Sequence, residues 1–134
     1  METRGDATTW TLLRNHGAEG LRCYEGGRYF EAHEHWESLW LEKRDPVKSF
    51  LQSLIKIAAA MHHLRRGNRV GALSHLRKVQ ARLAEIPAEF YGVKVSALRG
   101  DIERCIAEIE HGTAEADVPA PRICTLGATT RASG

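Results

Sequence analysis

The sequence predicts an all-α fold, a compact irregular antiparallel bundle of about five helices with no sheet. Apolar residues recur at helical spacing from about residue 19 to residue 111, and no alternating strand pattern competes with them. Glycine, proline and capping residues divide this stretch into segments of helix length with short connections, which favour antiparallel neighbours. A chain of 134 residues is also long enough for one hydrophobic core but not for two.

The ends of the predicted helices are marked by residues that start or stop a helix. The Gly26-Gly27 pair ends the first helix. Asp45 can cap the third helix, with Pro46 in its first turn, and Asn68 can cap the fourth. The third helix is apolar around most of its circumference, so we expect it at the centre of the bundle. The predicted helices cover residues 19–27, 28–43, 46–67, 69–86 and 95–112.

Both ends of the chain lack a helical period. Residues 1–18 are polar, and residues 112–134 contain two prolines and many small side chains, so we expect two flexible segments around a bundle domain at 19–111. The start of the chain has no apolar stretch typical of a signal peptide, and no run of about 18 apolar residues occurs. These features predict a cytoplasmic protein with no membrane partner.

Composition and charge exclude several classes of function. The net charge is only +2 with neutral histidines, so no strong field favours nucleic acid or a membrane surface. Three cysteines without a CxxC pair argue against a disulfide framework and against a cysteine-based zinc site, and favour a reducing compartment. The sequence contains neither a phosphate-binding loop nor a GxSxG nucleophile motif.

The stretch "YFEAHEHWESLW", residues 29–40, is the most unusual in the chain. On a helix, His33 and Glu37 lie one turn apart in the middle of a face that carries the large aromatic side chains. Glu31 and His35 project from the opposite side and are expected to face solvent. Because burying ionisable groups is costly, the pair predicts either a structural contact or a functional pocket. The aromatic residues of this face are Tyr29, Phe30, Trp36 and Trp40.

Metal binding is one candidate for the pair. His33 and Glu37 have the i,i+4 spacing that lets two side chains face one ion, but the sequence is HExxE and lacks the second histidine of the HExxH zinc-protease motif. A third ligand has to come from another helix, and His62, His63 and His75 are the candidates. A carboxylate-bridged di-iron site needs two Glu-x-x-His pairs on different helices, so a single divalent ion is favoured over it.

A basic stretch around residues 62–78 offers an alternative function. The loop from Arg65 to Arg69 could bind a phosphate or an RNA backbone weakly, next to the free amides at the start of the fourth helix. No aromatic side chain is interleaved with these charges, as stacking on single strands requires, so nucleic acid is a disfavoured partner.

"GRYFEAHEHWESLWLE" followed by "FLQSLIKIAAAMHHLRRGNRVGAL" closely resembles the domain-of-unknown-function 309 family over about residues 19–86. The resemblance implies a small, irregular, all-α bundle of bacterial or archaeal type, and it implies no established activity. Ser53 departs from the family pattern, which usually has glycine there. The matching positions are Ala32, His33, Glu34, Glu37, Trp40, Gln52, Leu54, Ile55, His63, Gly67, Asn68, Gly71 and Ala72.

Together these observations predict a polar pocket between the second and third helices that binds a small molecule or one divalent metal ion. The competing hypothesis is a structural or protein-interaction module in which His33 and Glu37 form a buried packing pair. If the pocket catalyses acid–base chemistry, it needs catalytic residues, whereas a binding site needs only lining side chains and hydrogen-bond partners. A homodimer is possible with the pocket and with the structural module. The candidates are His33, Glu34 and Glu37 as catalytic residues, Trp36, Trp40, Gln52, His63 and Asn68 as ligand-binding residues, and His33, Glu37 and His63 as metal ligands.

Overall fold

The computed structural model describes Leu13 and residues 17–125, and α-helices dominate this part of the chain. The predicted all-α fold is confirmed, and five helices occupy the predicted segments to within a few residues at each end. The predicted N-terminal segment at 1–18 lies almost entirely outside the described residues. The helices are α2 (Ala18–Glu25), α3 (Tyr29–Leu41), α4 (Val47–Arg65), α5 (Arg69–Leu83) and α6 (Val95–His111), followed by a single 3-10 turn, η2 (Glu115–Asp117).

The predicted capping residues form the bonds that start two of the helices. Asn68 caps α5, where its Oδ1 accepts a hydrogen bond of 2.9 Å from the amide of Gly71. The N-cap position of α4 is Pro46 and not Asp45 as predicted, but the carboxylate of Asp45 still satisfies one free amide of the first turn. It accepts hydrogen bonds from the amide and the hydroxyl of Ser49 at 3.0 and 2.6 Å. Gly67 has a φ of 84°, a conformation that glycine adopts at little cost, so the chain can turn between α4 and α5.

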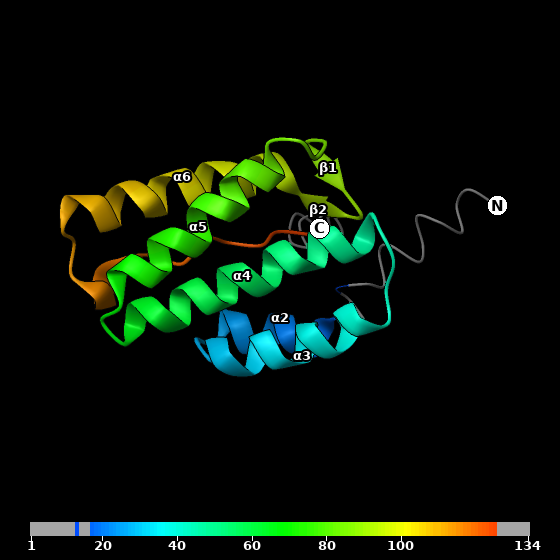
Figure 1. Cartoon of the computed structure of the whole chain (residues 1–134), viewed down its shortest axis with the longest axis horizontal. Helices are drawn as coiled ribbons and strands as arrows, with labels where there is room; N and C mark the ends of the chain where they lie inside the picture. Colours follow the sequence, from blue (N-terminus) through cyan, green and yellow to red (C-terminus); the bar gives the residue numbers. More distant parts are fainter. Residues whose placement is uncertain (1–12, 14–16, 126–134) are drawn as a thin grey trace, which may run out of the picture.

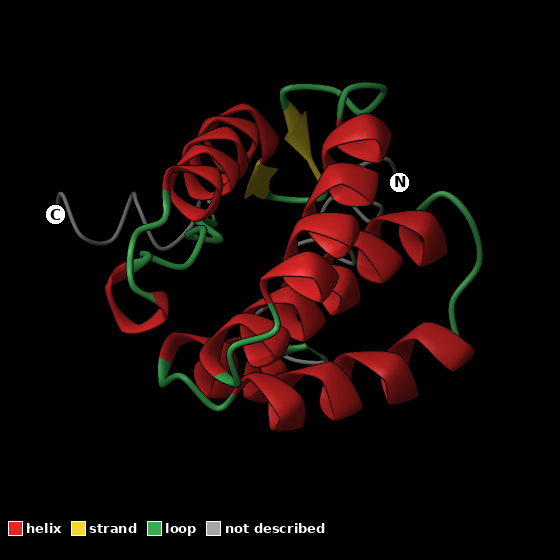
Figure 2. Cartoon of the chain, turned by 60° about the vertical axis from the view of Figure 1, so that its left-hand side comes forward, coloured by secondary structure: helices red, strands yellow, loops and turns green. Residues whose placement is uncertain are grey.

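Helix α4 lies at the centre of the bundle, as its apolar circumference predicts. It packs against α3 on one side and α5 on the other, with α2 beside α3 and α6 beside α5 (Figure 1). Figure 2 shows the same helices turned by 60° about the vertical axis, with the two short strands at the top of the view. Ten side chains of α4 are buried: Phe50, Leu51, Ser53, Leu54, Ile55, Ile57, Ala58, Ala60, Met61 and Leu64.

The expectation of no sheet is wrong in one detail. Two antiparallel strands of two residues each, β1 (Glu89–Phe90) and β2 (Val93–Lys94), form a hairpin between α5 and α6. The turn residues Tyr91 and Gly92 have positive φ angles of 50° and 76°. Two positive φ angles in a two-residue turn match the twist of the flanking strands. The ring of Phe90 also packs edge-on against buried Phe50, at 5.3 Å between centroids, which fixes the hairpin on α4.

The packed part of the chain continues beyond His111, where the sequence places the end of the bundle domain. After α6, residues 112–125 run back along the bundle towards the hairpin, and Val93 pairs with Thr125 in an isolated bridge (Figure 1). Val118 and Ile123 are buried at 1% and 5% exposure. The sequence does not reveal this packing because the segment buries only two large apolar side chains and has no period.

Candidate functional site

The buried face of α3 differs from the face that the aromatic residues predict. Ala32 and Trp36 are fully buried and Leu39 is nearly so, whereas Phe30 is half-exposed. The Trp36 indole donates a hydrogen bond of 3.2 Å to the carbonyl of Gly17. Trp36, expected as a wall of the pocket, is therefore a core residue that joins α3 to the start of α2.

The predicted burial of the His33–Glu37 pair is wrong for Glu37. The Glu37 side chain is 53% exposed and that of His33 is 26% exposed, and 4.0 Å separates the His33 Nε2 atom from a carboxylate oxygen of Glu37. This separation is longer than a hydrogen bond. Exposed ion pairs contribute little to stability, so this pair does not lock the helix packing.

A polar hollow does lie between α3 and α4, and α5 closes one side of it. Its volume is about 200 Å³. His33, Glu37, Trp40 and Gln52 line it, as the sequence predicts for these four. The complete lining is His33, Glu37, Trp40, Gln52, Ile55, Lys56, Ala59 and His75.

Three residues that line this hollow carry a buried polar atom without a hydrogen-bond partner. They are Nδ1 of His33, Nε1 of Trp40 and Nδ1 of His75; across the described residues one other buried side-chain atom, the hydroxyl oxygen of Ser53, has the same status. Nearly all buried polar atoms in folded proteins are paired. Three of the four unpartnered buried atoms in the described residues thus belong to side chains that line this one hollow.

Two further polar residues, His75 and Lys56, line the hollow. The sequence predicts His75 only as a possible third metal ligand, and it predicts no role for Lys56. Burial lowers the pKa of His75 below its ordinary value, and the ammonium group of Lys56 lowers it further. His75 is therefore neutral at pH 7, so that one ring nitrogen donates and the other accepts. The lining also contains the ammonium group of Lys56 and the carboxylate of Glu37.

His62 and His63 of α4 form ring contacts with residues of the two neighbouring helices, α3 and α5. The ring of His63 stacks on that of His75 at 5.4 Å, and the His62 ring lies 5.4 Å from the ring of Phe30, which in turn stacks on His33 at 6.0 Å. Burial also lowers the pKa of His62, with further lowering by Arg66. The His63–His75 and His62–Phe30 contacts join different helices and cannot be read from spacing, whereas Phe30 and His33 are three residues apart on α3.

Other predicted site residues lie outside the hollow. Glu34 is exposed and is not part of the lining. His63 is held by Asn68, whose amide nitrogen lies 3.2 Å from His63 Nδ1, while the same Asn68 side chain caps α5. His33, Glu37 and His63 are not brought together as metal ligands: in residues 17–125 the group of three that meets a 4.8 Å limit between donor atoms consists of other residues.

The arginines of the α4–α5 loop are used inside the molecule. Arg65 donates to the carbonyl oxygens of Glu115 and Val118 at 2.7 and 3.1 Å. Arg69 donates to the carbonyl of Ile109 at 3.0 Å, to that of Thr113, and to the Glu115 carboxylate. These bonds hold the C-terminal segment against the bundle. Two of the three arginines that the phosphate or RNA alternative requires are therefore engaged within the molecule, and Arg66 is the third.

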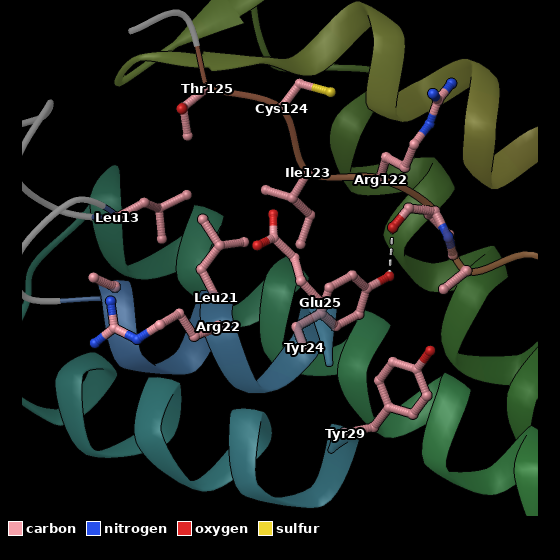
Figure 3. A pocket seen from close by; sticks show the side chains of 13 residues that line it. Leu13, Leu21, Arg22, Tyr24, Glu25, Tyr29, Arg122, Ile123, Cys124 and Thr125 are labelled. Carbon is pink, nitrogen blue, oxygen red and sulfur yellow. Dashed lines mark hydrogen bonds between the residues drawn. The ribbon is translucent and has the colours of Figure 1, made fainter. Parts of the chain in front are cut away.

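A larger hollow of about 810 Å³ lies between α2 and the C-terminal segment, with the hydrogen bond from Tyr24 to the Pro121 carbonyl at its side (Figure 3). Its lining is mostly apolar with Arg22, Glu25 and Arg122 at the edge.

The described helices contain no segment that is both long and apolar enough to cross a membrane. Among curated proteins, the chain is similar to an uncharacterised protein of Aquifex aeolicus (strain VF5), with 26% identity over 95 residues, which are 70% of this chain and 28% of the relative. The chain thus spans less than a third of that relative's length. Residues 18–75, which include α2, α3, α4 and the first turns of α5, match the family model described as "Domain of unknown function (DUF309)". The predicted resemblance to this family is therefore confirmed over residues 18–75.

Proposed function

We propose that the hollow between α3, α4 and α5 binds a small molecule that carries a carboxylate at one end and a hydrogen-bond donor at the other, such as a hydroxy or amino acid. The observation that supports the proposal is the group of three unpaired ring nitrogens on His33, Trp40 and His75. Leaving a buried donor or acceptor unpaired costs about 1–3 kcal/mol, and a ligand that supplies partners recovers that free energy.

The chemistry of the lining supports an anionic end on the ligand. Lys56 supplies a positive charge, and the indole of Trp40 can only donate. Gln52 can donate or accept beside them. A carboxylate accepts several hydrogen bonds at once and matches this group of donors.

The acidic residue of the lining, Glu37, supports a donor on the ligand. The Glu37 side chain is half-exposed, and its carboxylate forms no hydrogen bond with the described residues, since His33 Nε2 lies 4.0 Å away. Its oxygens can therefore accept hydrogen bonds from a ligand. A volume of about 200 Å³ is below the ~300–1,000 Å³ of sites for drug-sized ligands. The size therefore favours a molecule of a few carbons.

Nuclear magnetic resonance of the histidine side chains tests this proposal. Lactate, glycolate, alanine and glycine are added to the full chain, and we expect shifts of the ring signals of His33 and His75, with no shift for exposed His111. Lys56→Ala should weaken binding at least about tenfold, since it removes the charge-assisted bond. Lys78→Ala, an exposed lysine on α5 outside the lining, is the matched control.

The proposal fails if none of the four acids moves the His33 and His75 signals at millimolar concentration. It also fails if Lys56→Ala and Lys78→Ala weaken binding equally, because the attraction would then be a general effect of surface charge. Acetate and methylamine, each with one of the two ends, should bind more weakly than the molecules that combine them.

A further inference from the structure

A second group of ionisable residues lies on the other side of α3, where it faces α2. Glu19 and Cys23 are one turn apart on α2, so both side chains project from the same face of that helix. His35 reaches them from α3. The carboxylate, thiol and imidazole donor atoms all lie within 4.8 Å of one another.

We propose that Glu19, Cys23 and His35 bind a zinc ion. Thiolate, imidazole and carboxylate are the three side-chain ligands that zinc takes in proteins. In a tetrahedral site with metal–ligand bonds of ~2.0–2.3 Å, the donor atoms are roughly 3.3–3.7 Å apart. Side-chain rotations that move the donor atoms by roughly 1 Å bring donors within 4.8 Å of one another to that spacing. The fourth coordination position of the zinc ion remains open to water.

The surroundings of the three donors fit an ion that enters from solvent and is held at the edge of the core. Cys23 is 3% exposed, whereas Glu19 and His35 are exposed. The sulfur therefore lies on the core side of the site, the floor, and the two other ligands lie on its solvent side. The floor is fixed, because Trp36 packs directly over Gly20 and bonds to Gly17 at the start of α2. The two helices that carry the ligands are therefore held in close contact.

The charges of the site also suit a divalent cation. Arg22 hydrogen-bonds to one oxygen of Glu19 at 2.5 Å and holds the pKa of that carboxyl below its ordinary value, so Glu19 is ionised at neutral pH. The second oxygen remains available. When zinc binds, the Cys23 thiol loses its proton to solvent as the sulfur–zinc bond forms, and thiolate plus carboxylate neutralise the ion.

This site is independent of the small-molecule hollow. His33 and His35 belong to the same helix but point to opposite sides, one towards α4 and α5 and the other towards α2. The ion would join α2 to α3 at a point where the described residues provide hydrogen bonds and packing but no covalent link.

Cobalt spectroscopy on the full chain, purified without a histidine tag and treated with a chelator, tests the proposal. We expect about one equivalent of cobalt to bind with a near-ultraviolet sulfur-to-cobalt absorption band, and zinc to displace it. Cys23→Ser should remove the band and His35→Gln should weaken binding at least about tenfold. The matched controls are Cys124→Ser, the half-buried thiol of the C-terminal segment, and His111→Gln at the exposed end of α6; both should keep the band.

Because the thiol proton is released when the metal binds, the affinity for cobalt should be higher at higher pH. Absence of the band in the unmodified chain overturns the proposal, as does equal binding by His35→Gln and the unmodified chain. Since His35 is exposed, its variant gives a clear answer even if Cys23→Ser disturbs the core. His33→Gln should leave the cobalt band unchanged, which separates this site from the hollow.

Discussion

At Gly20, α2 lies close against Trp36 of α3, and Gly20→Ala tests how that contact supports the fold. A Cβ atom at this position would lie 2.4 Å from Nε1, 2.6 Å from Cδ1 and 2.9 Å from Cε2 of Trp36. All three atoms belong to the rigid indole of a fully buried side chain. Relief therefore requires the ring or the helix to move, which also loosens the hydrogen bond from Trp36 to Gly17.

The expected change in stability can be worked out from these contacts. Overpacking costs about 1–3 kcal/mol, and loss of the indole hydrogen bond costs about 1 kcal/mol. The greater helix propensity of alanine returns about 1 kcal/mol. We therefore expect Gly20→Ala to lower the free energy of unfolding by about 1–3 kcal/mol.

The same substitution at Gly100 is a control of opposite sign. Gly100 lies inside α6, and a Cβ atom there meets nothing within 4 Å. Gly100→Ala should stabilise the chain by about 0.5–1 kcal/mol through helix propensity alone. Urea unfolding followed by circular dichroism measures both variants. If Gly20→Ala is as stable as the unmodified chain, the contact between Gly20 and Trp36 is not tight, and the reasoning is refuted.

Two further predictions concern the arginine contacts and the buried histidine. Arg69→Ala should lower the free energy of unfolding by about 2–4 kcal/mol, because it removes several charge-assisted hydrogen bonds from a side chain that is 29% exposed. Arg66→Ala, at an exposed position, should change the free energy of unfolding by less than about 0.5 kcal/mol. Equal losses for the two variants in urea unfolding would show that the bonds to the C-terminal segment contribute nothing. His75 has a lowered pKa in the folded state, so between its folded value and the unfolded value of about 6.5 the unfolded chain binds more protons. The contribution of neutral His75 to stability is therefore complete above about pH 6.5 and is lost as the pH falls through the folded pKa. His75→Gln should therefore reduce the change in the free energy of unfolding between about pH 7.5 and 5.5. An unchanged pH dependence in that variant would assign the effect to other groups.

The helices could be predicted from the sequence because their signals are local. Asn68 and Asp45 act at the helix starts as their residue types predict. Helix α4 lies at the centre because it is apolar around most of its circumference. The hairpin has a local signal too, in the glycine of the Tyr91-Gly92 turn, but strands of two residues are too short for an alternating pattern to be recognised.

The site could be predicted only in part because its geometry depends on which face of α3 is buried. The aromatic residues suggest a face centred near His33, whereas the buried residues Ala32, Trp36 and Leu39 centre it about 90° away. The small Ala32 marks the contact with the core better than the half-exposed Phe30 does. This rotation turns Glu37 towards solvent.

Residues contributed by other helices could not be inferred from spacing in the sequence. His75 comes from α5, and its place beside His33 depends on how α5 crosses α4. The same holds for Cys23 and His35, which no sequence motif connects and which the α2–α3 contact brings together.

The hydrogen bonds that hold the C-terminal segment have a consequence for how this domain can change in evolution. Tyr24, Arg65 and Arg69 donate mainly to backbone carbonyls of residues 109–121, and a carbonyl is present whatever the side chain. The three donors lie within residues 18–75, the part that matches the family model, and the acceptors lie beyond it. The segment can therefore drift in sequence and keep its path, provided that apolar side chains remain where Val118 and Ile123 are buried. We expect relatives to share this C-terminal path even where their sequences after α5 no longer align.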